Sequence, residues 1–469
     1  MRKSIYFLAE MLASLLLLAA VHALSDHFQA RLTANSGRGW DGVWYCQMAD
    51  QIANRETVSA MAPFGYRVGV PFLAALADMH DIVHGFREVN IAGSYVTAIL
   101  LVIWFRLTIP RAGLRCVFFL LFLSNWLAPA RVVHVYPAYV DIWPYPFVLA
   151  VLLLTQALSR KGRTFTLILI TLLCAVGVLV RETVALVAFA VPFAYNPLGF
   201  TSSGAPTLRW RRIPKRLLLP VACAAMVFIS AHIFVHPTGR VRYWSQAMIF
   251  FYSKSWLGYC HSWLTAFGPI LLIPVYHFRE VKRYFSRRQY QAAYIAALIA
   301  VTLASSPDIE RHVLVALPVI YSLIAHIIDR KSNIWRAPAT VGLMVISQAL
   351  ASRVFLSIAP DEGVHPALVL LTPLSNRTPW HDLFPLYAIP RIAATSFWQY
   401  VLLGVVLLWF VEFRSADVIR VLRGASLHHG PGLRFPDSAV YDAVTAPQIP
   451  GVPAEAPAAL RDGTYPPNS

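Results

Sequence analysis

The chain is poor in charged residues, which make up 13% of its 469 residues. A soluble domain usually carries about 25%. Hydrophobic residues make up 57%, and apolar runs near the ~20 residues needed to cross a bilayer recur along the whole sequence. This composition excludes the soluble fold classes and predicts a polytopic membrane protein.

The chain also lacks the motifs of several enzyme classes. It contains no P-loop, no GxSxG elbow and no HExxH, and it shows no internal repeat of the transporter kind. The cysteines at 46, 116, 174, 223 and 260 have no metal-ligand spacing. A disulfide between Cys46 and Cys260 is one option if both face the same oxidising side. A divalent metal cofactor is possible, but no motif indicates one.

The net charge of +17 does not indicate a nucleic-acid partner, because no basic soluble domain is present to bind one. The basic residues lie in short clusters between apolar runs, and 24 of the 40 fall on alternate connections. This is the positive-inside pattern. It places both termini in the cytoplasm, together with the basic clusters at 106–115, 160–163, 209–216, 279–288, 330–336 and 414–423.

We therefore expect an all-α polytopic membrane protein with about twelve transmembrane helices in a module over residues 1–424. The first apolar run, at about 5–24, is either a signal peptide or a retained helix; Val21-His22-Ala23 is a poor cleavage site and favours the latter. A long first extracytoplasmic loop over 25–88 follows, and its 63–73 segment is apolar enough to lie on the membrane as a short helix. The other spans are expected at about 89–107, 116–133, 145–158, 165–180, 183–200, 217–235, 263–278, 290–304, 312–328, 338–355 and 397–413.

Two further features complete this organisation. The stretch 165–200 could also form one kinked helix, which would change the number of spans. Residues 425–469 are rich in Pro, Ala and Gly, and this composition predicts a disordered cytoplasmic tail.

Acidic residues gather on the opposite side from the basic clusters. In this topology 14 of the 23 acids lie outside. Acids contribute little to topology, so their position suggests a function on the outer face. The acids on that face are Asp26, Asp41, Asp50, Glu56, Asp78, Asp81, Glu88, Asp141, Glu182, Asp308, Glu310, Asp361, Glu362 and Asp382.

The most informative stretch in the outer loop is Gly39-Trp40-Asp41-Gly42-Val43-Trp44-Tyr45, followed by Asp50. The two glycines allow the backbone a tight path beside Asp41. The aromatic rings suit the lipid–water boundary. A membrane-surface loop with an aromatic belt would account for the rings without any chemistry.

Other polar groups recur on the same face. They are Tyr66-Arg67, Arg181-Glu182-Thr183, and Asp308 to His312 in a short connection. The loop after the third span adds Arg131, His134, Tyr136, Tyr139 and Asp141. Ionisable residues at membrane depth usually mark a functional site or a paired structural contact. Arg181 with Glu182, and Asp308 with Arg311, could each form such a self-contained ion pair.

A carboxylate and several arginines at an outer membrane interface suit the transfer of a group from a lipid phosphate. Guanidinium groups bind phosphate through two parallel hydrogen bonds. A carboxylate can take the proton of an acceptor hydroxyl. The aromatic rings can cover the lipid or stack on a sugar.

These motifs resemble those of the GT-C superfamily of integral membrane glycosyltransferases, which use polyprenyl-phosphate sugars. Trp40-Asp41-Gly42 through Ala49 resembles W-D-G-x-W-Y…A, Tyr66-Arg67…Pro71 resembles (Y/F)-R…P, Arg181-Glu182-Thr183 resembles R-E-(T/S), and Asp308…Arg311…Pro318 resembles D-x-x-R…P. The resemblance covers about residues 1–330. It implies a GT-C-like fold, a polyprenyl-phosphate sugar as partner, and a place in the inner (plasma) membrane of a bacterial cell envelope.

The resemblance also implies roles for particular residues. Asp41 would be the general base. Many members carry two adjacent acids, whereas here the second catalytic candidate, Asp50, lies nine residues further on, which leaves a metal requirement open. The candidates for binding the substrate and donor are Trp40, Tyr45, Tyr66, Arg67, Arg181, Glu182, Asp308 and Arg311, with Glu182 and Asp308 orienting the arginines.

Two other classes of function remain. A polytopic transporter or lipid-linked saccharide flippase would place ionisable residues near the bilayer midplane in two related halves, whereas here most charges lie at span ends. A non-catalytic membrane scaffold would leave Asp41 and the arginines unexplained.

Overall fold

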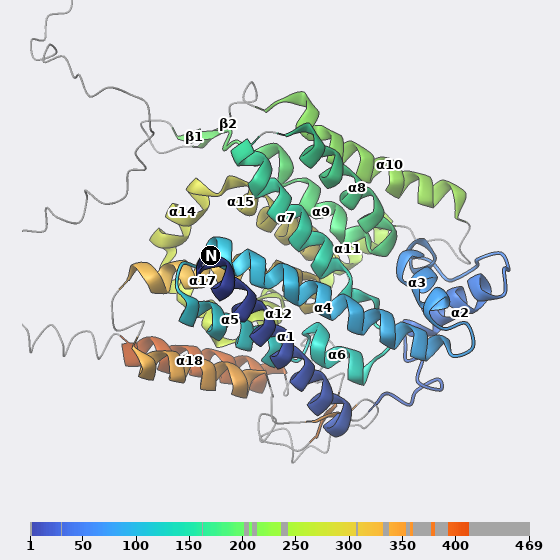
Figure 1. Ribbon diagram of the computed structural model, residues 1–469, viewed down its shortest axis with the longest axis horizontal. Helices are drawn as coiled ribbons and strands as arrows, with labels where there is room; N and C mark the ends of the chain where they lie inside the picture. The colour runs from blue at the N-terminus through green and yellow to red at the C-terminus, as the bar shows by residue number, and fades with distance from the viewer. Residues whose placement is uncertain are drawn as a thin grey trace, which may run out of the picture. The chain divides into compact units, whose positions relative to one another are not determined.

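The computed structural model describes residues 2–29, 31–161, 163–200, 206–208, 213–235, 243–305, 308–331, 337–352, 357–359, 377–379 and 393–411. These residues belong to one compact unit, Met1–Arg414, and they are predominantly helical (Figure 1). Within them, the strands are three residues long. β1 (Leu198–Phe200) pairs antiparallel with β2 (Pro206–Leu208), and β3 (Ser357–Ala359) pairs parallel with β4 (Arg377–Pro379).

Seven helical segments of the described chain are long and apolar enough to cross a membrane, which supports the predicted class of helical membrane protein. They are Ser4–Phe28, Ile82–Thr108, Ala112–Val135, Val140–Arg160, Lys215–Ile233, Ile309–Arg330 and Ala393–Val411. Each coincides with a span expected from the sequence. The other expected spans correspond to shorter apolar segments, of which Thr164–Val180, Glu182–Phe193, Gln289–Ala304 and Pro338–Ala351 are 10–17 residues long.

The helices in chain order have the following bounds. They are α1 (Arg2–Phe28), α2 (Gly42–Ala53), η1 (Phe64–Tyr66), α3 (Gly69–Ala77), α4 (Ile82–Thr108), α5 (Ala112–Ser124), α6 (Pro129–Val135), η2 (Val140–Ile142), α7 (Pro144–Lys161), α8 (Thr164–Val180), η3 (Glu182–Val184), α9 (Ala185–Ala188), η4 (Val191–Phe193), η6 (Lys215–Leu218), α10 (Leu219–Phe234), α11 (Tyr243–Ser253), α12 (Trp256–Phe267), η7 (Pro269–Leu271), α13 (Leu272–Tyr276), α14 (Phe278–Arg287), α15 (Gln289–Ala304), α16 (Ile309–Val313), η8 (Leu314–Ala316), α17 (Leu317–Arg330) and α18 (Pro338–Ala351).

Several apolar segments are broken helices rather than straight rods. The 165–200 stretch is not one helix, because α8 ends at Val180 and Arg181 adopts an extended conformation (φ −162°, ψ 133°). The segment 112–135 divides into α5 and α6, with Pro129 in the first turn of α6. Segment 263–278 breaks at Gly268, whose φ of +74° suits glycine.

Side-chain amides satisfy the backbone groups that these breaks release, as broken helices in a membrane require. The Asn125 side chain donates to the Ala266 carbonyl at 2.7 Å, and the Gln348 side chain donates to the Phe267 carbonyl at 3.0 Å. Both bonds are buried. They fix the break after α5 and the break after α12 against other parts of the chain.

The segment between α1 and α4, expected as the first outer loop, is folded. It contains α2, η1 and α3, and α3 packs against the start of α4; Figure 1 shows α2 and α3 (blue) together at that end of α4. Gly85 permits this packing, because a Cβ atom there would lie 2.4 Å from the Ala74 carbonyl oxygen. The short helix expected over 63–73 is thus present as η1 and the first turns of α3.

The helix α1 is bound to the rest of the molecule by polar contacts near both ends. The Glu10 carboxylate accepts hydrogen bonds from Arg115 Nε at 2.6 Å and from Arg106 Nη1 at 3.0 Å. Further along α1, His22 contacts Ser94 at 2.7 Å and His134 at 2.9 Å. These contacts hold both halves of α1 against α4, α5 and α6.

Two further expectations concern the C-terminal region and the cysteines. The predicted disordered tail over 425–469, and the outer acids Asp361, Glu362 and Asp382, lie outside the described residues. The suggested Cys46–Cys260 disulfide is wrong, because both cysteines are free: Cys46 is buried in α2, whereas Cys260 is exposed on α12.

We predict that Glu10→Gln destabilises the protein, because it leaves two partly buried arginines without their carboxylate. The Glu10 side chain is 14% exposed, so the cost should lie between that of a surface pair and that of a fully buried pair, at about 2 kcal/mol. Thermal unfolding of the purified protein measures it. Glu56→Gln, at an exposed position, is the matched control, and equal melting temperatures for the two variants would contradict the prediction.

Candidate active site

Asp41 lies directly before α2, at the N-cap position, yet its side chain makes no capping hydrogen bond to the helix. A residue at this position usually uses its side chain to accept from the first turn. The carboxylate of Asp41 instead extends toward Arg311, with 3.7 Å between Oδ2 and Nη1. Its side chain is 37% exposed, so it is both positioned by the protein and accessible.

Two glycines allow the backbone beside Asp41 to approach Tyr136 closely. Gly39 has a φ of +73°, and a Cβ atom there would lie 2.4 Å from the Tyr136 ring. The Gly42 backbone N–H donates to the Tyr136 hydroxyl at 2.6 Å. The contact with Tyr136 therefore provides a physical reason for both glycines of the motif.

Arg311 connects Asp41 to two other carboxylates. Its Nη1 lies 3.6 Å from Asp141 Oδ2, and its Nη2 pairs with Asp308. Asp141 pairs in turn with Arg181. Arg181 and Asp141 are 5% and 4% exposed, and this burial makes their pairing necessary, because an unpaired charge is costly away from water.

These groups line a narrow hollow between the start of α2, the loop around η2, and the starts of η3 and α16. Its lining residues are Asp41, Tyr45, Tyr136, Ala138, Tyr139, Val140, Asp141, Arg181 and Arg311. Burial raises the pKa of Tyr45, Tyr136 and Tyr139 above the usual value for a phenol. The three phenols therefore keep their protons at neutral pH and can act as hydrogen-bond donors.

Arg67 belongs to a second network beside the hollow. Its Nε donates to Glu182 at 2.8 Å, its Nη2 also donates to Glu182, and its Nη1 donates to the Tyr45 hydroxyl at 2.7 Å. Burial opposes the charge on Arg67, but Glu182 and Tyr45 outweigh it and raise the pKa of Arg67. Arg67 thus fixes Tyr45 of α2 to the turn between α8 and η3.

The pairing of Arg181 and Glu182 differs from the local ion pair that the sequence suggested. Arg181 does not form a self-contained pair with its neighbour Glu182; instead it pairs with Asp141 while Glu182 pairs with Arg67. Asp308 and Arg311 do pair with each other. Arg181 and Arg67 thus each bind an acid that is distant in the sequence. These two pairs connect η1, η2 and η3.

The other predicted site residues lie around the hollow. Trp40 packs edge-on against Tyr136, with 5.7 Å between the ring centres. Tyr66 stacks on His232 at 3.7 Å, and both line a small separate hollow with Glu182. Trp40 therefore supports the wall formed by Tyr136, and Tyr66 lies on the far side of Glu182.

Asp50 does not join Asp41. Its carboxylate pairs with Arg38 at 3.0 Å, and it does not line the hollow around Asp41. Nine residues along an α-helix correspond to about 13 Å and two and a half turns, so Asp50 lies on the opposite face of α2. The two acids are thus separated by the geometry of the helix.

The loop after the third span provides residues for which the sequence pattern indicated no particular role. Asp141, Tyr136 and Tyr139 stood out as polar groups in a short loop, and the structure places them in the walls of the hollow. Arg131 and His134 of the same group have other contacts: Arg131 donates to the Ser124 and Ser352 carbonyls, and His134 contacts His22. The sequence signal that could have identified Asp141 was an acid close to two tyrosines at the start of an apolar span.

The arrangement places one accessible carboxylate beside two guanidinium groups and three protonated phenols. Guanidinium groups can bind a phosphate, and the carboxylate can accept a proton. Among the described residues, no group of three or more His, Cys, Asp or Glu side chains has a geometry suited to a metal ion.

Comparisons of the chain with family models, with curated proteins and with solved structures gave no match.

We predict that Gly39→Ala disrupts the site, because its Cβ atom would overlap the Tyr136 ring and its φ is unfavourable for alanine. The variant should melt at a lower temperature. Gly113→Ala is the matched control: it lies in α5 with nothing within 4 Å of the new Cβ atom, and it should stabilise the helix by up to about 1 kcal/mol. Opposite signs in thermal unfolding are expected; a neutral Gly39→Ala would show that the Tyr136 contact is not tight.

Proposed function

We propose that the protein is an integral membrane glycosyltransferase of the GT-C kind. It has about twelve membrane spans, cytoplasmic termini and an active site on the extracytoplasmic side of a bacterial plasma membrane. It transfers a sugar from a polyprenyl phosphate to an acceptor hydroxyl. The acceptor is a glycan, a lipid or a protein.

The observation that carries this proposal is the position of Asp41 beside Arg311. Of the three carboxylates around Arg311, Asp41 has the most exposed side chain, at 37%, against 6% for Asp141 and 9% for Asp308. Its carboxylate also lies slightly farther from Arg311 Nη1 than that of Asp141, at 3.7 Å against 3.6 Å. Asp41 is therefore the carboxylate that an entering substrate can reach and separate from Arg311 most easily.

This geometry supports the following proposed chemistry. The donor phosphate binds the guanidinium groups of Arg311 and Arg181, replacing part of their contact with Asp41 and Asp141. The acceptor oxygen then attacks the anomeric carbon as the bond from that carbon to the phosphate oxygen breaks. Polyprenyl phosphate leaves with the electron pair, and Asp41 takes the acceptor proton. Because the acceptor attacks the face opposite the leaving phosphate in a single displacement, the configuration at the anomeric carbon inverts.

The remaining predicted residues support this centre. Asp308 orients Arg311, and Glu182 holds Arg67. Because the hydrogen-bond donors of Arg67 already face Glu182 and Tyr45, we assign Arg67 the role of positioning α2 rather than binding the donor. Asp50 has no role in this scheme, since it pairs with Arg38.

One observation favours the transporter or flippase alternative. Glu310, next to Arg311, is fully buried (0% exposed) within the span Ile309–Arg330. Buried acids in a membrane often mark a path for protons or ions. A transporter would need Glu310 for substrate movement, whereas the glycosyltransferase would need Asp41 for turnover, so paired Glu310→Gln and Asp41→Asn measurements separate the two functions.

The first test of the proposal is the orientation of the chain. Glu56→Cys and Lys282→Cys, both at exposed positions, report on the first outer loop and on α14. An impermeant maleimide applied to intact cells should label position 56 but not position 282, and both should react after the membrane is opened. Labelling of position 282 from outside would reverse the topology and remove Asp41 from the outer face.

The second test concerns the general base. Asp41→Asn keeps the shape of the side chain but removes its basic oxygen, so turnover should fall about a hundredfold to ten-thousandfold. The measurement is transfer of label from polyprenyl-phosphate sugars by purified protein. Asp50→Asn, within α2, is the matched control, and it should retain most of the activity.

Donor affinity separates the role of the base from that of the arginines. Asp41→Asn should leave donor binding intact, whereas Arg311→Lys keeps the charge but loses the planar fork and should weaken it. All variants are compared at equal folded yield. Near-normal turnover by Asp41→Asn would rule out its role as the base.

A further inference from the structure

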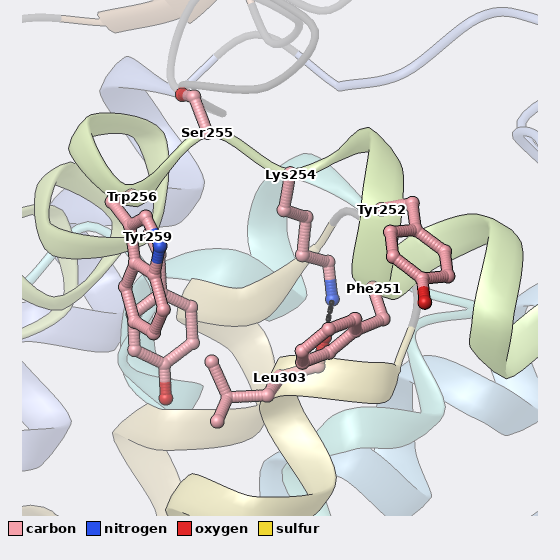
Figure 2. A pocket seen from close by; sticks show the side chains of 7 residues that line it. All are labelled: Phe251, Tyr252, Lys254, Ser255, Trp256, Tyr259 and Leu303. Atoms are coloured by element: carbon pink, nitrogen blue, oxygen red, sulfur yellow. Dashed lines mark hydrogen bonds between the residues drawn. The ribbon is translucent and has the colours of Figure 1, made fainter.

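A second hollow, separate from the one around Asp41, lies where α11, α12 and the end of α15 meet (Figure 2). Its volume is about 230 Å³. In the proposed topology this junction is on the outer side, like the candidate active site. Its lining residues are Phe251, Tyr252, Lys254, Ser255, Trp256, Tyr259 and Leu303.

Aromatic rings form two of its walls. Phe251 and Tyr252 come from α11, whereas Trp256 and Tyr259 come from α12, and Figure 2 shows the two pairs on either side of Lys254. Tyr252 and Trp256 are 75% and 71% exposed. Large aromatic side chains usually bury most of their surface, so these rings present an uncovered apolar surface to any molecule in the hollow.

Lys254 provides a polar floor that is already satisfied. Its ammonium group donates to the Thr302 carbonyl at 2.8 Å and to the Leu303 carbonyl at 3.3 Å, and it also donates to the Ser305 carbonyl. An ammonium group has three donors, and the end of a helix attracts a cation. An anionic ligand would have to displace these backbone contacts. The geometry therefore favours a neutral occupant.

The hollow is also connected to the candidate active site through the chain. Lys254 binds Ser305 at the end of α15, and Asp308, three residues later, pairs with Arg311. The helix α16, which follows Asp308, packs against α12. A molecule bound between Trp256 and Leu303 would thus lie beside the end of α15, which precedes Asp308, the partner of Arg311, in the chain.

We propose that this hollow binds one neutral pyranose ring of a glycan acceptor, an inference that rests on the proposed glycosyltransferase function. A pyranose offers an apolar C–H face to the aromatic rings and a hydroxyl group to the exposed Tyr252 hydroxyl, whereas the Ser255 hydroxyl caps α12 and the Tyr259 hydroxyl bonds to Thr302. Pockets for larger organic ligands span about 300–1,000 Å³, so a hollow of about 230 Å³ fits a single ring. The Tyr252 hydroxyl at the rim offers a sugar hydroxyl a partner that a hydrocarbon chain would not use.

The test measures binding of methyl glucoside, methyl galactoside and methyl mannoside to the purified full-length protein in nanodiscs. Saturation-transfer NMR detects the binding. Trp256→Ala should weaken binding of the preferred glycoside about tenfold, as expected for loss of one aromatic contact. Trp256→Phe should restore most of it. Trp398→Ala is the matched control, because Trp398 is 63% exposed but does not line the hollow. Melting temperatures verify that each variant is folded.

Transfer kinetics provide a second readout. Trp256→Ala should raise the KM for a glycan acceptor and leave the KM for the donor unchanged. If Trp256→Ala and Trp398→Ala behave alike, both rings belong only to the aromatic belt of the membrane and the inference is overturned. Preferential binding of glycerol 3-phosphate over the glycosides would also overturn it, in favour of an anionic headgroup.

The two proposals can fail separately. Trp256-dependent binding of a glycoside by a protein that transfers no sugar would support the pyranose site and reject the glycosyltransferase. Asp41-dependent transfer that ignores Trp256 would do the reverse.

Discussion

The candidate active site depends on the guanidinium group of Arg311, which faces carboxylates from three elements of the chain: Asp41 before α2, Asp141 in η2, and Asp308 before α16. A guanidinium keeps its charge under all ordinary conditions, and burying it requires nearby acids. Arg181 provides a second cation, paired with Asp141. Three carboxylates therefore share two guanidinium groups, and the carboxylate with the most exposed side chain, Asp41, is the one left available for chemistry.

The breaks in the apolar helices make this network possible. A continuous helix would use its backbone groups internally, whereas the breaks at Asn125, Arg181 and Asp308 place polar side chains at helix ends. The released backbone groups would be costly in lipid. Buried amides such as Asn125 and Gln348 compensate for them, so the interruptions are stable features of the fold.

The folded segment between α1 and α4 provides the other half of the candidate site. Two separate contacts position the start of α2: the Gly42 N–H donates to the Tyr136 hydroxyl, and the Tyr45 hydroxyl accepts from Arg67, which Glu182 holds in turn. These contacts come from different sides of the hollow, and together they fix the direction in which Asp41 points. A loop bound at only one point would leave that carboxylate free to move away from Arg311.

The sequence by itself determined the class of protein and several members of the site. Apolar runs and positive clusters report directly on burial in lipid, so the helical membrane class and the positions of most apolar segments could be predicted. The glycines around Asp41 and the charged residues at span ends could also be identified from the sequence, because such residues are unusual beside apolar spans. Only the tertiary structure decided which charges pair. Asp141 lies in the wall of the hollow beside Asp41, Arg67 pairs with Glu182 and Tyr45, and Asp50 is separated from Asp41, because ion pairs form between residues brought together by folding. Arg181 and Asp141 are 40 positions apart, and no local pattern encodes their contact.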